Sequence, residues 1–80
     1  MDVLLFGIAK DIVGQSEIQI SREETLPNSV QELKEFMIRK FPGFGKLSSF
    51  AVAVNSEYAL DNVALNTNDE IAIIPPVSGG

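Results

Sequence analysis

Hydrophobic and polar residues follow two different patterns in the first quarter of the chain. Residues 3–8 form a nearly continuous apolar run, which is typical of a strand buried on both faces. Gly7 interrupts this run and marks either a β-bulge or a close backbone approach. Residues 9–16 break the pattern, so we expect a loop with at most one helical turn, ended by Gly14. Residues 17–21 alternate polar and apolar side chains, which predicts a strand with one wet face.

A helical pattern follows a polar segment. Ser29 and Glu32 have the spacing of a capping box, in which each side chain accepts a hydrogen bond from a backbone N–H at the start of a helix. Apolar residues then recur at steps of three and four, which predicts one stripe facing the core: Val30, Leu33, Met37 and Phe41, with Phe36 beside them. Pro42 and Gly43 should end this helix.

The second half of the chain reads as short strands joined by turns. Residues 44–49 are a connector, and residues 50–54 are a second dense apolar run that suits a buried strand. A turn at 55–57 leads into a short strand at 58–59. After an irregular stretch and a turn at 66–69, residues 70–74 form the last strand.

This order of elements predicts a small α+β domain. The densest apolar runs belong to the first strand and to the strands at 50–54 and 70–74, so these should occupy the sheet interior. One amphipathic helix can then cover one face of the sheet, which gives two layers. We expect a single domain over residues 1–80 of ubiquitin-like β-grasp type, with a mixed sheet packed on one main helix and an extended tail at 75–80.

Composition and charge restrict the class of partner. The 80 residues are 45% hydrophobic, which is enough for one core. Six basic and eleven acidic residues give a formal charge of −5, so binding to nucleic acid is not expected. A protein with a basic face is the favoured partner.

The chain contains neither cysteine nor histidine, which excludes several chemistries. Disulfides, cysteine-ligated zinc, thiol nucleophiles and Ser-His-Asp triads need one of these residues. Plant-type ferredoxins share the β-grasp architecture but need four cysteines, so they are excluded as well. We expect no metal site, no signal peptide and no membrane span, and we expect a cytoplasmic protein.

The remaining candidates for catalysis are explained more simply by structure. The carboxylate pairs Glu23–Glu24 and Asp69–Glu70 lie in polar stretches where a solvated role is expected, and Glu32 is needed as a cap. Phe36, Met37 and Phe41 are expected in the core rather than in a cofactor pocket. Residues 41–45 contain glycines without the spacing of a phosphate loop, so we expect a turn there.

The tail at residues 75–80 differs from the rest of the chain. Pro75 and Pro76 donate no ladder hydrogen bonds, so the strand must leave the sheet and the tail must project, by at most roughly 20 Å. Small residues follow, and Gly79 and Gly80 could pass through a channel too narrow for other side chains. The reactive group would be the Gly80 carboxylate, which needs activation before it can donate an acyl group. A frayed terminus or an expression scar would look the same.

Several segments together resemble a known family over nearly the whole chain. The segments are VLLF at residues 3–6 with AKDIVG at 9–14, SVQEL at 29–33, VAVN at 52–55 and DEIAIIPPVSGG at 69–80. The chain resembles the ubiquitin-like sulfur carriers that form the small subunits of molybdopterin synthases. Asn68 stands where that family usually has glycine, a position at which asparagine can adopt the same left-handed conformation.

The resemblance implies a mechanism centred on Gly80. An adenylyltransferase of the ubiquitin-activating type would use ATP to form a glycyl adenylate, and a sulfur donor would convert it to a thiocarboxylate. The tail would insert into the large synthase subunit and give sulfur to cyclic pyranopterin monophosphate (precursor Z) during molybdenum cofactor biosynthesis. The chain would thus donate sulfur without being the catalytic subunit, and it would hold no permanent cofactor.

The resemblance also implies partners and contact residues. A heterotetramer with two copies of each subunit is expected, in which Pro75, Pro76, Val77, Ser78 and Gly79 enter the large subunit. Lys10, Tyr58 and Ile74 stand at positions that contact partners in the family, although surface or core roles would explain them equally. Alternatives are a carrier for thiamine or tRNA thiolation, a protein modifier, or an interaction domain that does not use its end.

Overall fold

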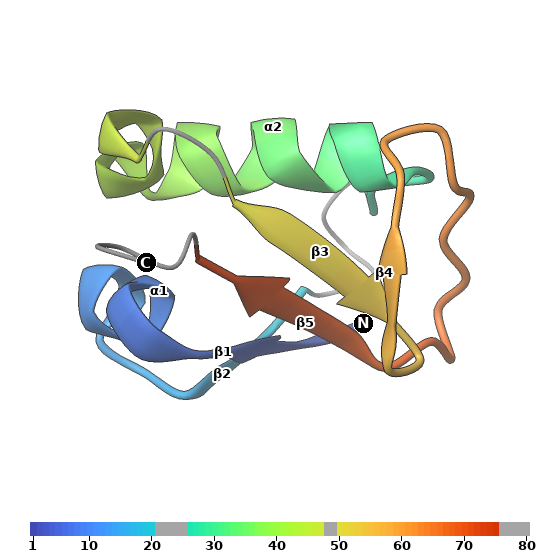
Figure 1. Cartoon of the computed structure of the whole chain (residues 1–80), viewed down its shortest axis with the longest axis horizontal. Coiled ribbons are helices and arrows are strands. Elements are labelled where there is room, and N and C mark those ends of the chain that lie inside the picture. Colours follow the sequence, from blue (N-terminus) through green and yellow to red (C-terminus); the bar gives the residue numbers. More distant parts are fainter. Residues whose placement is uncertain (21–25, 48–49, 76–80) are drawn as a thin grey trace.

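The protein folds as a five-stranded mixed sheet covered on one face by a long helix (Figure 1). The structure, a computed structural model, describes residues 1–20, 26–47 and 50–75. The elements are β1 (Asp2–Leu5), α1 (Gly7–Val13), β2 (Glu17–Gln19), α2 (Val30–Lys40), the 3₁₀ helix η1 (Pro42–Lys46), β3 (Ala51–Val54), β4 (Glu57–Ala59) and β5 (Ile71–Ile74). The predicted α+β, β-grasp architecture is confirmed.

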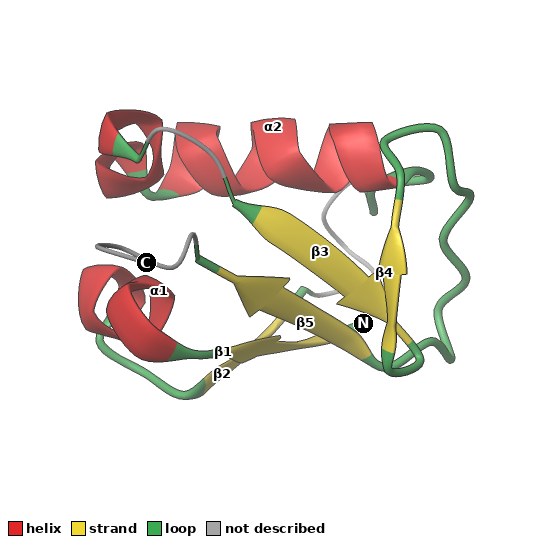
Figure 2. Cartoon of the chain, in the orientation of Figure 1, coloured by secondary structure: helices red, strands yellow, loops and turns green. Residues whose placement is uncertain are grey.

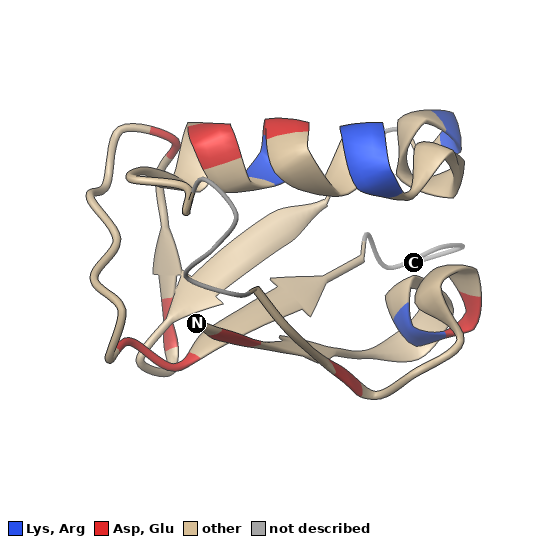
Figure 3. Cartoon of the chain, turned by 180° about the vertical axis from the view of Figure 1, so that it is seen from behind, with Lys and Arg blue, Asp and Glu red and all other residues tan. Residues whose placement is uncertain are grey.

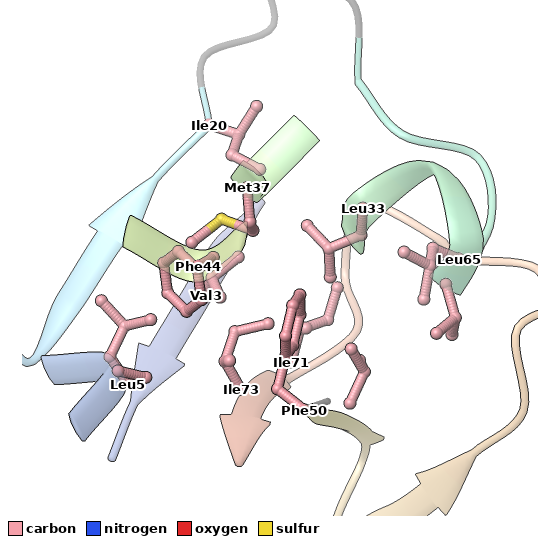
Figure 4. Close-up of a cluster of buried hydrophobic side chains, with 13 residues drawn as sticks. Val3, Leu5, Ile20, Leu33, Met37, Phe44, Phe50, Leu65, Ile71 and Ile73 are labelled. Atoms are coloured by element: carbon pink, nitrogen blue, oxygen red, sulfur yellow. The ribbon is translucent and has the colours of Figure 1, made fainter. Parts of the chain in front are cut away.

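The strand order β2-β1-β5-β3-β4 places the three densest apolar runs inside the sheet, as predicted. β1 and β5 are parallel, and every other neighbouring pair is antiparallel. Because Val3 pairs with Ile71 and Val52 pairs with Ile73, their side chains form one layer beneath α2. This layer packs against Leu33 and Met37 of the helix (Figure 4).

The interior strands bury mainly the face beneath α2, and on the second face only Ala53 of β3 is buried among their described residues, which corrects the prediction of burial on both faces. Val3 and Leu5 are buried, whereas Leu4 between them is only partly buried. Ile71 and Ile73 alternate in the same way with Ala72 and Ile74. Most apolar residues on the second face are only partly buried, so the composition of these strands predicts more burial than the structure has.

The first strand is shorter than predicted, and a helix replaces the loop expected after it. β1 ends at Leu5, and α1 begins at Gly7, whose φ of +54° ends the extended conformation. The close approach predicted at Gly7 is confirmed, since a Cβ built there would lie 3.2 Å from Cγ of Pro75. Gly14 ends α1 in the left-handed conformation and donates its N–H to the Lys10 carbonyl, as expected for a helix stop.

The main helix has the predicted start and core-facing stripe. The Ser29 hydroxyl accepts a hydrogen bond from the Glu32 N–H at 3.2 Å, while the Glu32 carboxylate accepts one from the Asn28 N–H instead of that of Ser29. Val30, Leu33 and Met37 are fully buried. Phe36 and Phe41 are only partly buried beside them.

The segment after the main helix is not a plain turn or connector. Pro42–Lys46 forms η1, and Phe44 within it is 1% exposed and packs against Phe50 at a ring-centroid distance of 5.3 Å. Phe44 is therefore a core residue that the sequence pattern did not identify. Figure 2 shows η1 continuing from the end of α2, at the same end of the molecule as α1.

Candidate functional site

The uncovered face of the sheet, together with the start of the tail, forms the candidate site. The register aligns Leu4 with Ala72, Ala72 with Ala53, and Ala53 with Tyr58, so one row of side chains crosses four strands. The two alanines in the middle are small, which leaves a depression between the larger residues at its ends.

We call this depression the outer face. It has a volume of about 340 Å³. Its lining residues are mostly apolar: Leu4, Phe6, Ala53, Ser56, Tyr58, Glu70, Ala72 and Ile74. Phe6 is 51% exposed and Tyr58 is 75% exposed, although both are large aromatic residues. Exposed aromatic residues around a shallow depression are typical of protein-binding surfaces.

Two of the predicted contact residues meet on the outer face, and the third lies beside it. Tyr58 and Ile74 both line the depression. Lys10 does not, but it lines an adjoining depression of about 450 Å³ that shares Leu4 and Phe6 with the outer face. The three predicted residues therefore border one continuous surface.

Leu4 and Phe6 were missed as site residues because they belong to a run that reads as buried. Phe6 is the N-cap residue of α1, and its extended backbone carries the side chain out of the core. The signal that could have identified it is Gly7, because a glycine with positive φ directly after a strand changes the direction of the chain.

A network of side-chain hydrogen bonds fixes the β3–β4 turn against the start of β5. Asn55 and Ser56 have φ values of 53° and 70°, which fit a tight hairpin turn. The Asn55 amide donates to Asp69 Oδ1 at 3.0 Å, and its oxygen accepts from the Glu70 N–H at 2.9 Å. This network holds the turn that precedes Tyr58 beside β5.

Asp69 is held as a carboxylate rather than as a proton donor. Its Oδ2 accepts a hydrogen bond from the Asn66 N–H at 2.8 Å, and this bond, followed by the one from Asn55, lowers the pKa of Asp69 below its ordinary value of 3.8. The pair Asp69–Glu70 thus has a structural role in the turn. The other carboxylate pair, Glu23–Glu24, lies outside the described residues.

The tail begins at a defined point. β5 ends at Ile74, and Pro75 packs on the glycine that starts α1. The residues predicted to carry the chemistry, Pro76, Val77, Ser78, Gly79 and Gly80, lie outside the described residues. Within the described ranges, no group of three or more acidic residues could hold a metal ion, and no helix is long and apolar enough to cross a membrane.

Comparison with known proteins identifies relatives along nearly the whole chain. A model of the ThiS family matches residues 3–80. The molybdopterin synthase sulfur carrier subunit of Dictyostelium discoideum is 39% identical, over 98% of this chain and 93% of that protein. The corresponding subunit of Arabidopsis thaliana is 34% identical, over 98% of this chain and 80% of that protein.

Solved structures show the same fold. A molybdopterin converting factor subunit 1 from Pyrococcus furiosus matches with a TM-score of 0.80 and 21% identity, over 95% of both chains. SAMP1 from Haloferax volcanii matches with a TM-score of 0.76 and 21% identity, over 99% of this chain and 97% of that one. A chain from a complex of subunits 1 and 2 of the molybdopterin-converting factor of Helicobacter pylori matches at 0.63 and 26% identity, over 99% and 96%.

Proposed function

Because the chain belongs to the ThiS family, we propose that it is the sulfur carrier subunit of a molybdopterin synthase. The observation that carries this proposal is the similarity to such subunits over 98% of the chain. The family match extends to Gly80, the residue that would bear the sulfur.

The chemistry takes place at the Gly80 carboxylate. The carboxylate attacks the α-phosphate of ATP on an adenylyltransferase of the ubiquitin-activating type, which releases pyrophosphate and forms a glycyl adenylate. A donor supplies sulfur at the oxidation level of sulfide and displaces AMP, which leaves a thiocarboxylate. In the large subunit the thiocarboxylate sulfur attacks a carbon of cyclic pyranopterin monophosphate and displaces an oxygen substituent from it, and water then cleaves the acyl–sulfur bond, which leaves the sulfur on the pterin and restores the carboxylate.

The described residues support this proposal through the point at which the tail begins. β5 is a central strand: Ile73 pairs with both β1 and β3, and its last residue, Ile74, pairs with Ala51 of β3. Pro75 leaves the sheet directly from this strand. A tail that starts from a rigid strand loses less conformational freedom when it enters a partner than one that starts from a loop.

The outer face is the surface by which we expect the large subunit to hold the domain. Its aromatic residues Phe6 and Tyr58 provide apolar area, and Lys10 adds a charge at the edge. Ile74 belongs both to this face and to the strand that leads into the tail. Binding at the outer face would therefore also direct the tail into the active site of the large subunit, in an assembly with two copies of each subunit.

Intact mass spectrometry tests the sulfur chemistry directly. The protein is incubated with a molybdopterin synthase adenylyltransferase, ATP and a sulfur source, and a reaction without ATP is the control. We expect a mass gain equal to the exchange of one oxygen for one sulfur, and we expect it only with ATP. The enzyme is first shown to be active on the carrier protein of its own organism. If that active enzyme produces no mass gain with this chain, the proposal is wrong.

Other sulfur-carrier pathways give a different binding pattern. A carrier for thiamine or tRNA thiolation would acquire the same thiocarboxylate but would not bind a molybdopterin synthase large subunit. Co-purification with that subunit, with a thiazole synthase as the competing bait, separates these functions. The similarity to small archaeal modifier proteins concerns the fold, whereas the relatives of similar sequence named above are synthase subunits.

A further inference from the structure

A second apolar groove lies between α1 and η1, away from the outer face. It has a volume of about 530 Å³, and its apolar walls come from Ile8 and Ile12 of α1 and from Phe41 and Leu47 at the two ends of η1. It shares no lining residue with the outer face. The two surfaces could therefore bind different molecules.

The floor of this groove is fixed by direct contact between its two helices. A Cβ at Gly43 of η1 would lie 2.9 Å from Cγ2 of Ile12, so glycine permits an approach that other residues would obstruct. The buried Ala9 attaches α1 to the core, whereas Ile8 beside it is 48% exposed. Ile8 is thus an aliphatic residue that the core does not use.

The charges around the groove have the opposite sign to the net charge of the chain. The charged residues among its lining are Lys40 and Lys46, and neither aspartate nor glutamate lines it. Lys40 also lies over the ring of Phe36, 5.5 Å from its centroid, so Lys46 is the more important charge for this argument. Asp11 is on α1 but outside the lining.

Acidic residues predominate on the parts of the molecule away from the groove. Figure 3 shows them on the first half of α2, near the turn between β3 and β4 and on β1 and β2, whereas the second half of α2 and η1 carry basic residues alone and α1 carries one of each sign. In a chain with a formal charge of −5, an acidic partner would be repelled by most of the surface and attracted here.

We infer that this groove binds a segment of a partner protein that combines aliphatic or aromatic side chains with carboxylates. The apolar side chains fill the groove between Ile8 and Leu47, and the carboxylates approach Lys46. Since α1 begins at Gly7, on which Pro75 packs, the bound segment would lie near the start of the tail. This inference does not depend on sulfur chemistry. It can therefore fail while the proposed function holds, and it can hold while the proposed function fails.

Selection from a random peptide library displayed on phage tests the inference. The intact chain is the bait, and the double variant Ile8→Glu, Lys46→Glu is used to remove peptides that bind elsewhere. We expect the remaining peptides to contain leucine, isoleucine or phenylalanine together with aspartate or glutamate. No enrichment over the double variant, or enrichment of basic peptides, overturns the inference.

Chemical shift mapping then locates the bound peptide. Titration of the ¹⁵N-labelled chain with a selected peptide should shift the amide signals of Ile8, Ile12, Lys46 and Leu47 and leave Tyr58 unchanged. Shifts confined to the outer face, or shifts that require anionic lipid vesicles instead of peptide, contradict it. Line broadening that increases with protein concentration without peptide would indicate a second copy of this chain as the occupant and would also contradict it.

Single variants with matched controls complete the test. Ile8→Glu and Lys46→Glu should each weaken peptide binding at least tenfold. Ile38→Glu, at a position that is 42% exposed and outside the groove, and Arg39→Glu, which makes the same change in charge as Lys46→Glu, should leave the affinity within twofold. Equal effects of the groove and control variants would exclude a specific site.

Discussion

Gly7 and Pro75 lie against each other directly after the end of β5. Gly7 combines a φ of +54° with a neighbouring proline ring, and either feature alone disfavours a side chain. Gly14 has a φ of +85° but open space around its Cβ position. Comparing the two positions therefore distinguishes destabilisation by backbone strain from destabilisation by contact with Pro75.

Replacing each glycine with alanine measures these costs. Gly14→Ala should lower the free energy of unfolding by about 1 kcal/mol, because only the backbone is strained. Gly7→Ala should cost more than that, since the new methyl group also displaces Pro75. Urea denaturation gives both values, and equal losses would show that Pro75 does not pack on Gly7 in solution.

Asp69 gives the domain an acid-sensitive contribution to stability. Its native pKa lies below the ordinary value of 3.8 because the Asn66 N–H and the Asn55 amide donate hydrogen bonds to the carboxylate. The stabilisation is therefore present above pH 3.8 and is lost as the pH falls through the lower native pKa. The variant Asp69→Asn should lose this part of the pH dependence.

NMR titration of the side-chain carboxyl carbon checks this assignment. In the wild type the Asp69 pKa should lie below 3.8, and in Asn55→Ala it should rise toward that value, since one donor is removed while the Asn66 N–H remains. An unchanged pKa in Asn55→Ala would mean that the amide does not stabilise the carboxylate.

At the scale of elements, a helix could be predicted from the sequence only where its cap and its apolar periodicity were clear. α2 has eleven residues, a capping serine and a periodic apolar stripe, so its sequence identifies it. α1 has seven residues and no side-chain cap, and its first apolar residue, Ile8, reads as part of the apolar run of β1, which Gly7 alone interrupts. η1 was not predicted because Gly43 and Gly45 are typical of a turn, although the segment contributes Phe44 to the core.

Phe44 tests whether η1 is part of the core. Phe44→Ala should lower the free energy of unfolding by about 3 to 5 kcal/mol, because a large ring is removed from a filled interior. Ile38→Ala, at an exposed position of the neighbouring α2, should cost far less, about 0.5 kcal/mol. Denaturant unfolding followed by circular dichroism distinguishes these outcomes, and a mild Phe44→Ala would place the ring outside the core.

β4 and the residue that follows it offer a matched pair for testing the outer face. Tyr58 and Leu60 are 75% and 76% exposed, but only Tyr58 lines the outer face. Tyr58→Ala should weaken binding to the large synthase subunit roughly tenfold and change the free energy of unfolding by less than about 0.5 kcal/mol. Leu60→Ala should change neither the affinity nor the free energy of unfolding. Isothermal titration calorimetry measures the affinity, and denaturant unfolding measures the stability. Equal losses of affinity would argue against the outer face as the contact surface.

At the scale of the whole molecule, composition predicted which strands lie inside the sheet, but it predicted neither their order nor the binding surfaces. The dense apolar runs predicted the interior strands because central strands have two neighbours and little contact with water. The outer face depends on register, since Leu4, Ala72, Ala53 and Tyr58 belong to four strands and form one row only when these strands align. Apolar residues that bind a partner have the same composition as apolar residues of a core, so periodicity alone could not distinguish them.

Removing Gly80 separates the two parts that the proposed function assigns to this chain. Gly80 has no side chain that could add to the core, so the deletion variant should unfold at the same denaturant concentration as the wild type. It should still bind the large subunit through the outer face, but the ATP-dependent mass gain and the formation of molybdopterin should be lost. Tyr58→Ala should show the opposite result. It should bind the large subunit more weakly, but it keeps the Gly80 carboxylate and should still show the ATP-dependent mass gain. If the chain without Gly80 still supported molybdopterin formation, the sulfur would have to be carried elsewhere, and no cysteine is present to carry it.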